Sequence, residues 1–142
     1  MADYYTKFSF ILSLPDEAAQ KHALDLDSQA RRIRLEDEPP NDFPASLVEA
    51  VEDWSFETDA ESSPDNWEIW LHSESGGLDA VCAFIQHLLL TFAPEDRLTF
   101  EWSNDCSKPR LDAYGGGAAV ITAKEIQTMC TTQWLEQHTL KE

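Results

Sequence analysis

Residues 78–92 read LDAVCAFIQHLLLTF. Apolar side chains recur at positions i, i+3, i+4, i+7, i+10, i+11 and i+14 of this run, namely Leu78, Val81, Cys82, Ile85, Leu88, Leu89 and Phe92. At 3.6 residues per turn, this spacing gathers them on one stripe of an α-helix. Gly76-Gly77 precedes the run, and Pro94 follows it. The sequence therefore predicts an amphipathic helix over 78–92.

Strands are predicted on both sides of this helix, because apolar and polar residues alternate there with a period of two. The predicted strands span residues 4–14, 54–59, 66–72, 98–102 and 118–121. Residues 61–65 join the second and third strands as a hairpin turn. In the third strand the alternation directs Trp67, Ile69 and Leu71 to the core.

Two further helices are predicted before the hairpin. Pro15-Asp16-Glu17 is typical of a first helical turn, where the fixed φ of proline and the helix dipole favour these residues. That helix is expected to reach about Gln29. A loop over residues 36–43 follows, and Pro44 then opens a short helix.

The C-terminal part is expected to form a strand followed by two helices. Thr122 and Glu125 have the spacing of a capping box, which predicts a helix directly after the last strand. Thr132 is expected to cap a final helix, with Trp134 and Leu135 packing inward.

The order of these elements defines the predicted fold class, which is α+β. A β-α-β-β-α-β succession is typical of a ferredoxin-like split βαβ sheet with its helices on one face. The remaining residues add the C-terminal β-α-α extension. A chain of 142 residues suits one domain, 1–142, which buries about two-thirds of its unfolded surface.

Charge is distributed very unevenly along the chain. Residues 35–96 contain sixteen carboxylates and no lysine or arginine, so this acidic block supplies 16 of the 17 net negative charges. A hydrophobic fraction of 42% argues against a disordered acidic tail. Such a surface repels nucleic acid and anionic membranes and attracts basic proteins. The sequence does not establish whether these carboxylates converge on one face.

The hairpin carries the clearest candidate binding site. Residues two apart on a strand are roughly 6.6 Å apart, so Glu57, Asp59 and Glu61 form a ladder of charge. Its scale is comparable to that of successive phosphates on one DNA strand, which combine a rise of about 3.4 Å each with a sideways displacement. Trp70 lies on the polar face of its strand, either under a neighbouring element or as an exposed interface anchor. The predicted partner-binding residues are Glu57, Asp59, Glu61, Asp65, Glu68 and Trp70.

The other chemistry-bearing residues give weaker signals. We predict no catalytic residue, cofactor or metal site, because the acidic loops lack a calcium-binding pattern and the histidines and cysteines lack zinc-ligand spacing. The glycines of residues 115–117 are expected to relieve a bulge or a close strand crossing. Three cysteines without CxxC spacing suit reduced thiols, and no apolar run approaches the roughly 20 residues of a membrane span. We therefore expect a cytoplasmic protein.

Both ends of the chain resemble a group of small acidic hypothetical proteins from bacteria, phages and plasmids. The resemblance is carried by residues 4–10 (YYTKFSF), 100–102 (FEW), 106–110 (CSKPR), 115–117 (GGG) and 132–135 (TQWL). No activity comes with this group. The resemblance implies a setting in which mobile elements encode acidic inhibitors of host nucleases.

The sequence favours a non-enzymatic acidic binding protein, in its most concrete form a DNA mimic that blocks a basic nucleic-acid-binding protein or a nuclease. Three alternatives stay open. The first is an immunity-type inhibitor of one basic toxin, and the second is a small-molecule-binding or enzymatic domain that uses residues 104–117. The third is a solubilising or structural subunit, in which the acids form only a solvated face and a sheet edge serves homodimerisation.

Overall fold

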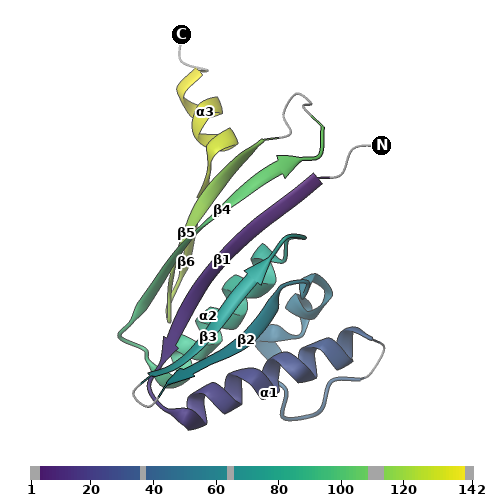
Figure 1. Ribbon diagram of the computed structural model, residues 1–142, viewed down its shortest axis with the longest axis vertical. Helices are drawn as coiled ribbons and strands as arrows, with labels where there is room; N and C mark the ends of the chain where they lie inside the picture. The colour runs from purple at the N-terminus through teal and green to yellow at the C-terminus, as the bar shows by residue number, and fades with distance from the viewer. Residues whose placement is uncertain (1–3, 36–37, 64–65, 109–113, 140–142) are drawn as a thin grey trace.

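The computed structural model describes residues 4–35, 38–63, 66–108 and 114–139. Its elements, in chain order, are β1 (Tyr4–Leu14), α1 (Glu17–Arg34), the short 3-10 helices η1 (Ala45–Leu47) and η2 (Glu49–Asp53), β2 (Glu57–Ser63), β3 (Asn66–Ser73), α2 (Leu78–Phe92), β4 (Arg97–Cys106), β5 (Gly115–Thr122), β6 (Ile126–Cys130) and α3 (Thr131–Thr139). The strands form one six-stranded sheet. Figure 1 shows α1 and α2 beside one half of it and α3 at the far end. The α+β class is confirmed.

All neighbouring strands of the sheet are antiparallel, in the order β2-β3-β1-β4-β5-β6. Strand β1 changes partner along its length, since residues 4–7 pair with β4 and residues 8–14 pair with β3. Aromatic rings pack where β1 and β4 diverge, and the rings of Phe10 and Phe100 are stacked at 4.4 Å. One half of the sheet is therefore β2-β3-β1, and the other half is β4-β5-β6.

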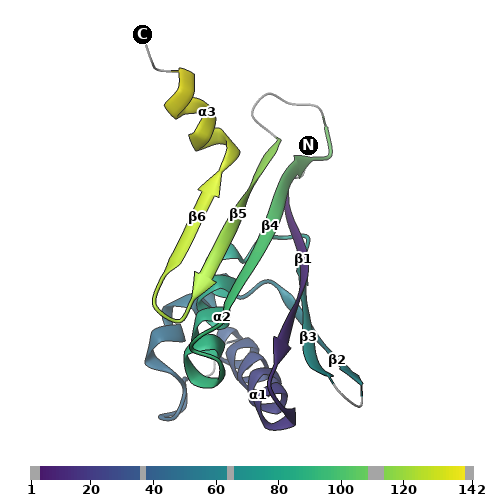
Figure 2. The ribbon, with the colours of Figure 1, turned by 90° about the vertical axis from the view of Figure 1, so that its left-hand side faces the viewer.

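The core lies between α1, α2 and one face of the sheet (Figure 2). Even-numbered residues of β1 and odd-numbered residues of β3 face the helices, in line with the predicted alternation. The helical stripe predicted over 78–92 also faces the core: its five central residues are buried, together with Ala80 and Phe84, and Leu78 and Phe92 at its ends are partly buried. Across the described residues, no helix is long and apolar enough to cross a membrane.

Several predicted boundaries differ from the structure. Strand β2 continues to Ser63, through residues predicted as the turn, and β4 and β5 extend beyond the predicted 98–102 and 118–121. Helix α1 continues five residues past Gln29, to Arg34, and its first turn is capped by Asp16, whose Oδ1 accepts a hydrogen bond from the N–H of Ala19 at 2.9 Å. Residues 54–56 are not part of β2, which begins at Glu57. Side chains of α1 bind residues 54–56 instead. The alternation of apolar and polar residues in the sequence cannot predict such contacts.

The predicted β-α-α extension is wrong, because a sixth strand stands where its first helix was expected. The hydroxyl of Thr122 accepts hydrogen bonds from the N–H groups of Lys124 and Glu125, and the N–H of Thr122 donates to the carbonyl of Glu125. The Thr-x-x-Glu spacing therefore closes a hairpin turn between β5 and β6 instead of capping a helix.

The final helix exists, but its predicted burial is wrong. Every residue of α3 is exposed, including Trp134 at 50% and Leu135 at 54%. The indole of Trp134 stacks only on the neighbouring turn, against His138 at 4.1 Å. The apolar pair of α3 thus packs against no part of the described core.

One buried carboxylate connects α1 to the beginning of β2. Asp27 is buried, with 7% of its surface exposed. Its carboxylate accepts hydrogen bonds from Trp54 Nε1 at 2.7 Å, Thr58 Oγ1 at 2.9 Å and Arg31 Nε at 3.0 Å. Arg31 also donates to the carbonyl of Phe56. This network holds the buried Trp54 and positions the strand that carries the predicted charge ladder.

We predict that Asp27→Ala lowers the free energy of unfolding by about 3 kcal/mol, because Trp54 Nε1 and the Thr58 hydroxyl lose a charged acceptor in the interior. Denaturant titration followed by tryptophan fluorescence measures the change. Asp25→Ala is the matched control on the same helix. The Asp25 carboxylate pairs with exposed Lys21, so its loss should change the stability by at most about 0.5 kcal/mol. Equal effects of both substitutions would contradict this account.

Two histidines meet where α1 and α2 pack together. His22 Nε2 and His87 Nε2 are 3.3 Å apart, so one nitrogen donates its proton to the other. The ring of Phe92 lies edge-on against His22 at 5.3 Å. Burial, followed by the proximity of His22, lowers the pKa of His87 from its ordinary value of 6.5. The folded state therefore favours neutral His87.

The lowered pKa of His87 makes the free energy of unfolding depend on pH. Below pH 6.5 the unfolded chain protonates His87 before the folded chain does, so the stability contributed by neutral His87 is lost as the pH falls. His87→Gln should flatten the decline of the unfolding free energy between pH 7 and about pH 5.5. His138→Gln, on exposed α3, should leave the decline unchanged. If the unfolding free energy of His87→Gln declined with pH as steeply as that of the wild type, His87 would not cause the decline.

Candidate functional site

The face of the sheet opposite α1 and α2 brings together most of the predicted binding residues. We call the side chains there from β2, β3 and β1 the open face. Its described members include Glu57, Asp59, Glu68, Trp70, His72, Lys7, Ser9, Ile11 and Ser13. Cross-strand pairing sets them in rows, and one row runs Asp59–Trp70–Ile11. No described helix covers these rows.

Two carboxylates of β2 converge on one histidine of β3. His72 Nε2 is 2.8 Å from Asp59 Oδ2, and His72 Nδ1 is 3.6 Å from Glu57 Oε2. The side chains of Glu57 and Asp59 remain 69% and 58% exposed, so His72 leaves most of their surface to solvent. The carboxylates can therefore bind His72 and still contact a partner.

Trp70 lies at the centre of the open face. Its indole Nε1 donates a hydrogen bond to Ser9 Oγ at 2.8 Å, and its ring stacks on His72 at 3.8 Å. The side chain is half-buried by these neighbours, without an overlying helix. Because its rotamer is fixed by stacking and by a hydrogen bond, Trp70 could contact a partner with little loss of conformational entropy.

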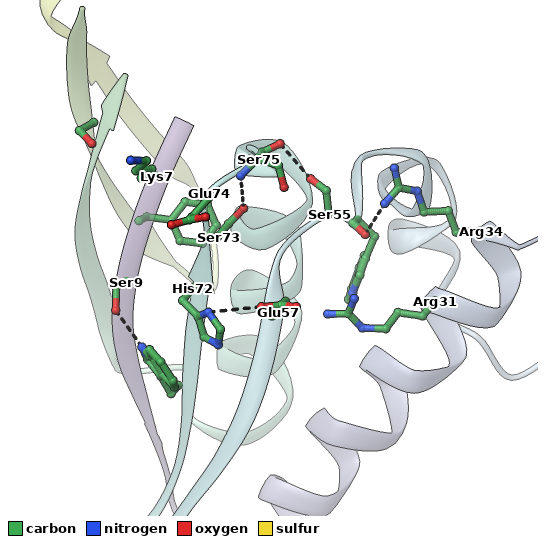
Figure 3. A pocket seen from close by; sticks show the side chains of 14 residues that line it. Lys7, Ser9, Arg31, Arg34, Ser55, Glu57, His72, Ser73, Glu74 and Ser75 are labelled. Atoms are coloured by element: carbon green, nitrogen blue, oxygen red, sulfur yellow. Dashed lines mark hydrogen bonds and ion pairs between the residues drawn. The ribbon is translucent and has the colours of Figure 1, made fainter. Parts of the chain in front are cut away.

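A cavity of about 900 Å³ opens beside Trp70 (Figure 3). It is lined by Lys7, Phe8, Ser9, Arg31, Arg34, Trp54, Ser55, Glu57, Trp70, His72, Ser73, Glu74, Ser75 and Ser103. Figure 3 shows Arg31 and Arg34 reaching it from α1, on the opposite side from His72 and Lys7. The cavity thus extends the open face to the beginning of β2.

The cations of this cavity are already engaged by the protein. Arg34 NH1 donates to the carbonyl of Trp54 at 2.7 Å, and Arg31 binds Asp27. Lys7 Nζ lies 3.3 Å from Asp105 Oδ2. Asp27 and Asp105 pair with Arg31 and Lys7, whereas the neutral carbonyl of Trp54 leaves the charge of Arg34 in place. The cavity therefore carries charges of both signs, with Glu57 on its β2 side.

The structure brings together four of the six predicted binding residues, namely Glu57, Asp59, Glu68 and Trp70. Glu68 is half-buried and accepts a hydrogen bond from Ser13 Oγ at 3.0 Å. Glu61 belongs to β2 and pairs with Glu68, but its side chain lies outside the described parts. Asp65 lies outside the described residues altogether.

The acidic block does not converge on one surface. A second group of carboxylates, Glu49, Glu52, Asp53 and Asp79, lines a separate hollow of about 550 Å³ at η2 and the start of α2. Asp53 Oδ2 accepts a long hydrogen bond from the N–H of Ala80 at 3.4 Å. In the described ranges, no cluster of three or more His, Cys, Asp or Glu residues could hold a metal ion.

The glycine run of residues 115–117 has a structural explanation at Gly117. A Cβ at Gly117 would lie 2.3 Å from the Trp102 ring and 2.3 Å from the carbonyl oxygen of Met129. Trp102 and Gly117 are direct partners between β4 and β5, so the indole covers the bare backbone of Gly117. Gly117 is thus explained by a ring that packs on it within the regular β4–β5 pairing, and not by the bulge or close strand crossing expected from the sequence. Residues 109–113 of the same segment lie outside the described part.

The cysteines are free thiols where the structure places them. Burial, and to a lesser extent the nearby Asp79, raises the pKa of Cys82 to about 12. Because only the thiolate is a strong nucleophile, Cys82 is a packing residue of α2. The cavity beside Trp70 includes neither Cys106 nor Cys130.

The sequence reasoning missed several residues around Trp70. Arg31 and Arg34 line the cavity but lie on α1, well before the hairpin in the sequence, whereas Glu74 directly follows β3. Only the packing of α1 against residues 54–56 brings the two arginines there. Ile11, which is 49% exposed, was visible as the one apolar exception on the polar side of β1.

Comparison with known proteins adds no relative, because no family model, no curated protein and no solved structure matches the chain.

We predict that Gly117→Ala destabilises the protein by about 2 kcal/mol or more, because the added methyl group overlaps the Trp102 ring and a backbone carbonyl that cannot both move aside. Thermal or denaturant unfolding measures the change. Lys124→Ala, at the exposed β5–β6 turn, should have little effect. Wild-type stability of Gly117→Ala would show that the Trp102 ring and the Met129 carbonyl do not lie this close to Gly117.

Proposed function

We propose that the protein binds another protein through its open face, and that the partner presents a basic surface. The observation that supports this most directly is the convergence of Glu57 and Asp59 beside Trp70 on a sheet face that no described helix covers. Interfaces commonly combine a central aromatic residue with a polar, charged rim. Here Trp70 is the candidate anchor, and the carboxylates of β2 are the rim.

Electrostatics supports a basic partner. The chain carries a formal net charge of −17, which accelerates encounter with positive surfaces and repels nucleic acid. The open-face carboxylates on β2 follow each other every second residue, roughly 6.6 Å apart. Because this spacing is comparable to that of phosphates on a DNA strand, we propose a DNA mimic that occupies the nucleic-acid site of its partner.

We also infer that the first four strands form a ferredoxin-like unit. The support is the order of its elements, in which β3 lies between β1 and β2, and β1 lies between β3 and β4. Helices α1 and α2 each connect two strands that are separated by one other strand. The three free thiols suit a reducing cytoplasm, where we place the protein.

The test is binding to a panel of purified basic DNA-binding proteins and nucleases, measured by fluorescence anisotropy with short duplex DNA as competitor. We predict a partner whose affinity falls as salt rises from about 50 mM to about 500 mM. Glu57→Lys with Asp59→Lys should weaken binding at least about tenfold, because the reversed charges face the same basic surface. Duplex DNA should displace the protein.

Glu49→Lys with Glu52→Lys is the matched control, since it makes the same change in net charge at the separate acidic hollow. Its effect should be several-fold smaller than that of the open-face pair. Equal losses from both pairs would show that binding depends on total charge alone. Binding that resists both salt and the open-face substitutions would contradict the proposal.

A further inference from the structure

The two edges of the sheet differ in a way that concerns association. An edge strand presents unpaired backbone N–H and C=O groups, and proteins usually protect it with charged residues, proline or a bulge. The β2 edge carries acidic residues, including Glu57 and Asp59. The β6 edge reads IQTMC and contains neither a charge nor a proline. Strand β6 is therefore open to pairing, whereas β2 is not.

The helix that follows β6 contacts the sheet at its first turn, where Thr131 Oγ1 accepts a hydrogen bond from the N–H of Gly116 at 3.1 Å. Helix α3 has nine residues, and none of them is buried. Isolated helices shorter than about 12 residues are marginal in water, so their stability comes from packing. Figure 2 shows α3 standing beyond the end of the sheet, away from α1 and α2.

Apolar side chains extend along both elements. Ile126 and Met129 of β6 are 38% and 44% exposed, and Trp134 and Leu135 of α3 are about half exposed. Because Ile126 and Met129 are three residues apart on a strand, they lie on opposite sides of the β6 edge. Together with Trp134 and Leu135 they place exposed apolar side chains along this edge and the helix that follows it, which indicates an interaction surface. We call the exposed faces of β6 and α3 the C-terminal surface.

We propose that the C-terminal surface is the interface of a homodimer, in which β6 pairs antiparallel with β6 of a second copy and the two α3 helices pack against the joined edge. In a dimer with a two-fold axis the two β6 strands run antiparallel, so the unpaired backbone groups of each edge bond to those of the other copy. A five-residue strand pair alone falls short of the roughly 1,600 Å² typical of a stable interface. The apolar faces of both α3 helices supply the remainder.

The charge distribution favours a second copy of the chain as the partner of the C-terminal surface. Residues 97–142 contain six carboxylates and five basic side chains, a net charge of −1, whereas the acidic block carries 16 of the 17 net negative charges. Two copies joined at the C-terminal surface therefore meet at their least charged ends. A strongly basic partner would find no complementary charge there, and it would be drawn to the acidic surfaces.

Sedimentation velocity over a concentration series tests the dimer. The wild-type chain should sediment at twice its monomer mass, with a dissociation constant below about 0.1 mM. Met129→Lys places a charge on the edge and should raise this constant at least about tenfold. Trp134→Ala with Leu135→Ala should do the same from α3, and circular dichroism confirms that each variant is folded.

Leu35→Ala is the control, because Leu35 is 76% exposed at the end of α1, away from the C-terminal surface. Its dissociation constant should equal that of the wild type. A wild-type monomer up to about 0.5 mM would overturn the proposal. So would a dimer that is unaffected by the folded β6 and α3 variants. Added salt should strengthen this dimer by screening the repulsion between copies, the opposite of its expected effect at the open face.

Discussion

The buried carboxylate of Asp27 links the scaffold to the candidate site. Its three hydrogen bonds attach α1 to Trp54 and Thr58, and the neighbouring Arg31 secures the carbonyl of Phe56. A buried charge is tolerated because every contact to it is a donor. Since these residues lie directly before and within β2, the network sets where the acidic strand begins and which of its side chains face away from the helices. The open face depends on that choice of register, because a slip of one residue would turn Glu57 and Asp59 toward the core.

Strong local periodicity explains which parts of the fold could be predicted from the sequence. Helix α2 and strand β1 are long and regular, so their spacing alone identifies them. Strand β6 was missed because five residues give little periodicity, and because Thr122 and Glu125 suit a turn as well as a helix cap. The burial of Trp134 and Leu135 was predicted from residue type alone. That prediction is wrong because no core surface reaches α3.

The same reason explains which residues of the candidate site could be predicted from the sequence. Alternation within one hairpin was enough to predict that Glu57, Asp59, Glu68 and Trp70 are candidates, because their relative positions depend on neighbouring residues. The contribution of Arg31 and Arg34 depends on how α1 lies across the sheet, which no local pattern records. The separation of Glu49 and Glu52 from the open face has the same origin. Charge counted along a chain therefore indicated an acidic protein without indicating that its acids occupy two surfaces.

The central claim is that partners dock on the open face. It is tested most directly by NMR titration of the isotopically labelled protein with a basic protein that binds it. The indole N–H of Trp70 reports from the centre of that face, through its hydrogen bond to Ser9. The account predicts that the largest shift changes fall on this indole, on His72 and on the backbone of residues 57–59. Changes confined to η2 and the start of α2, or to β6 and α3, would contradict it.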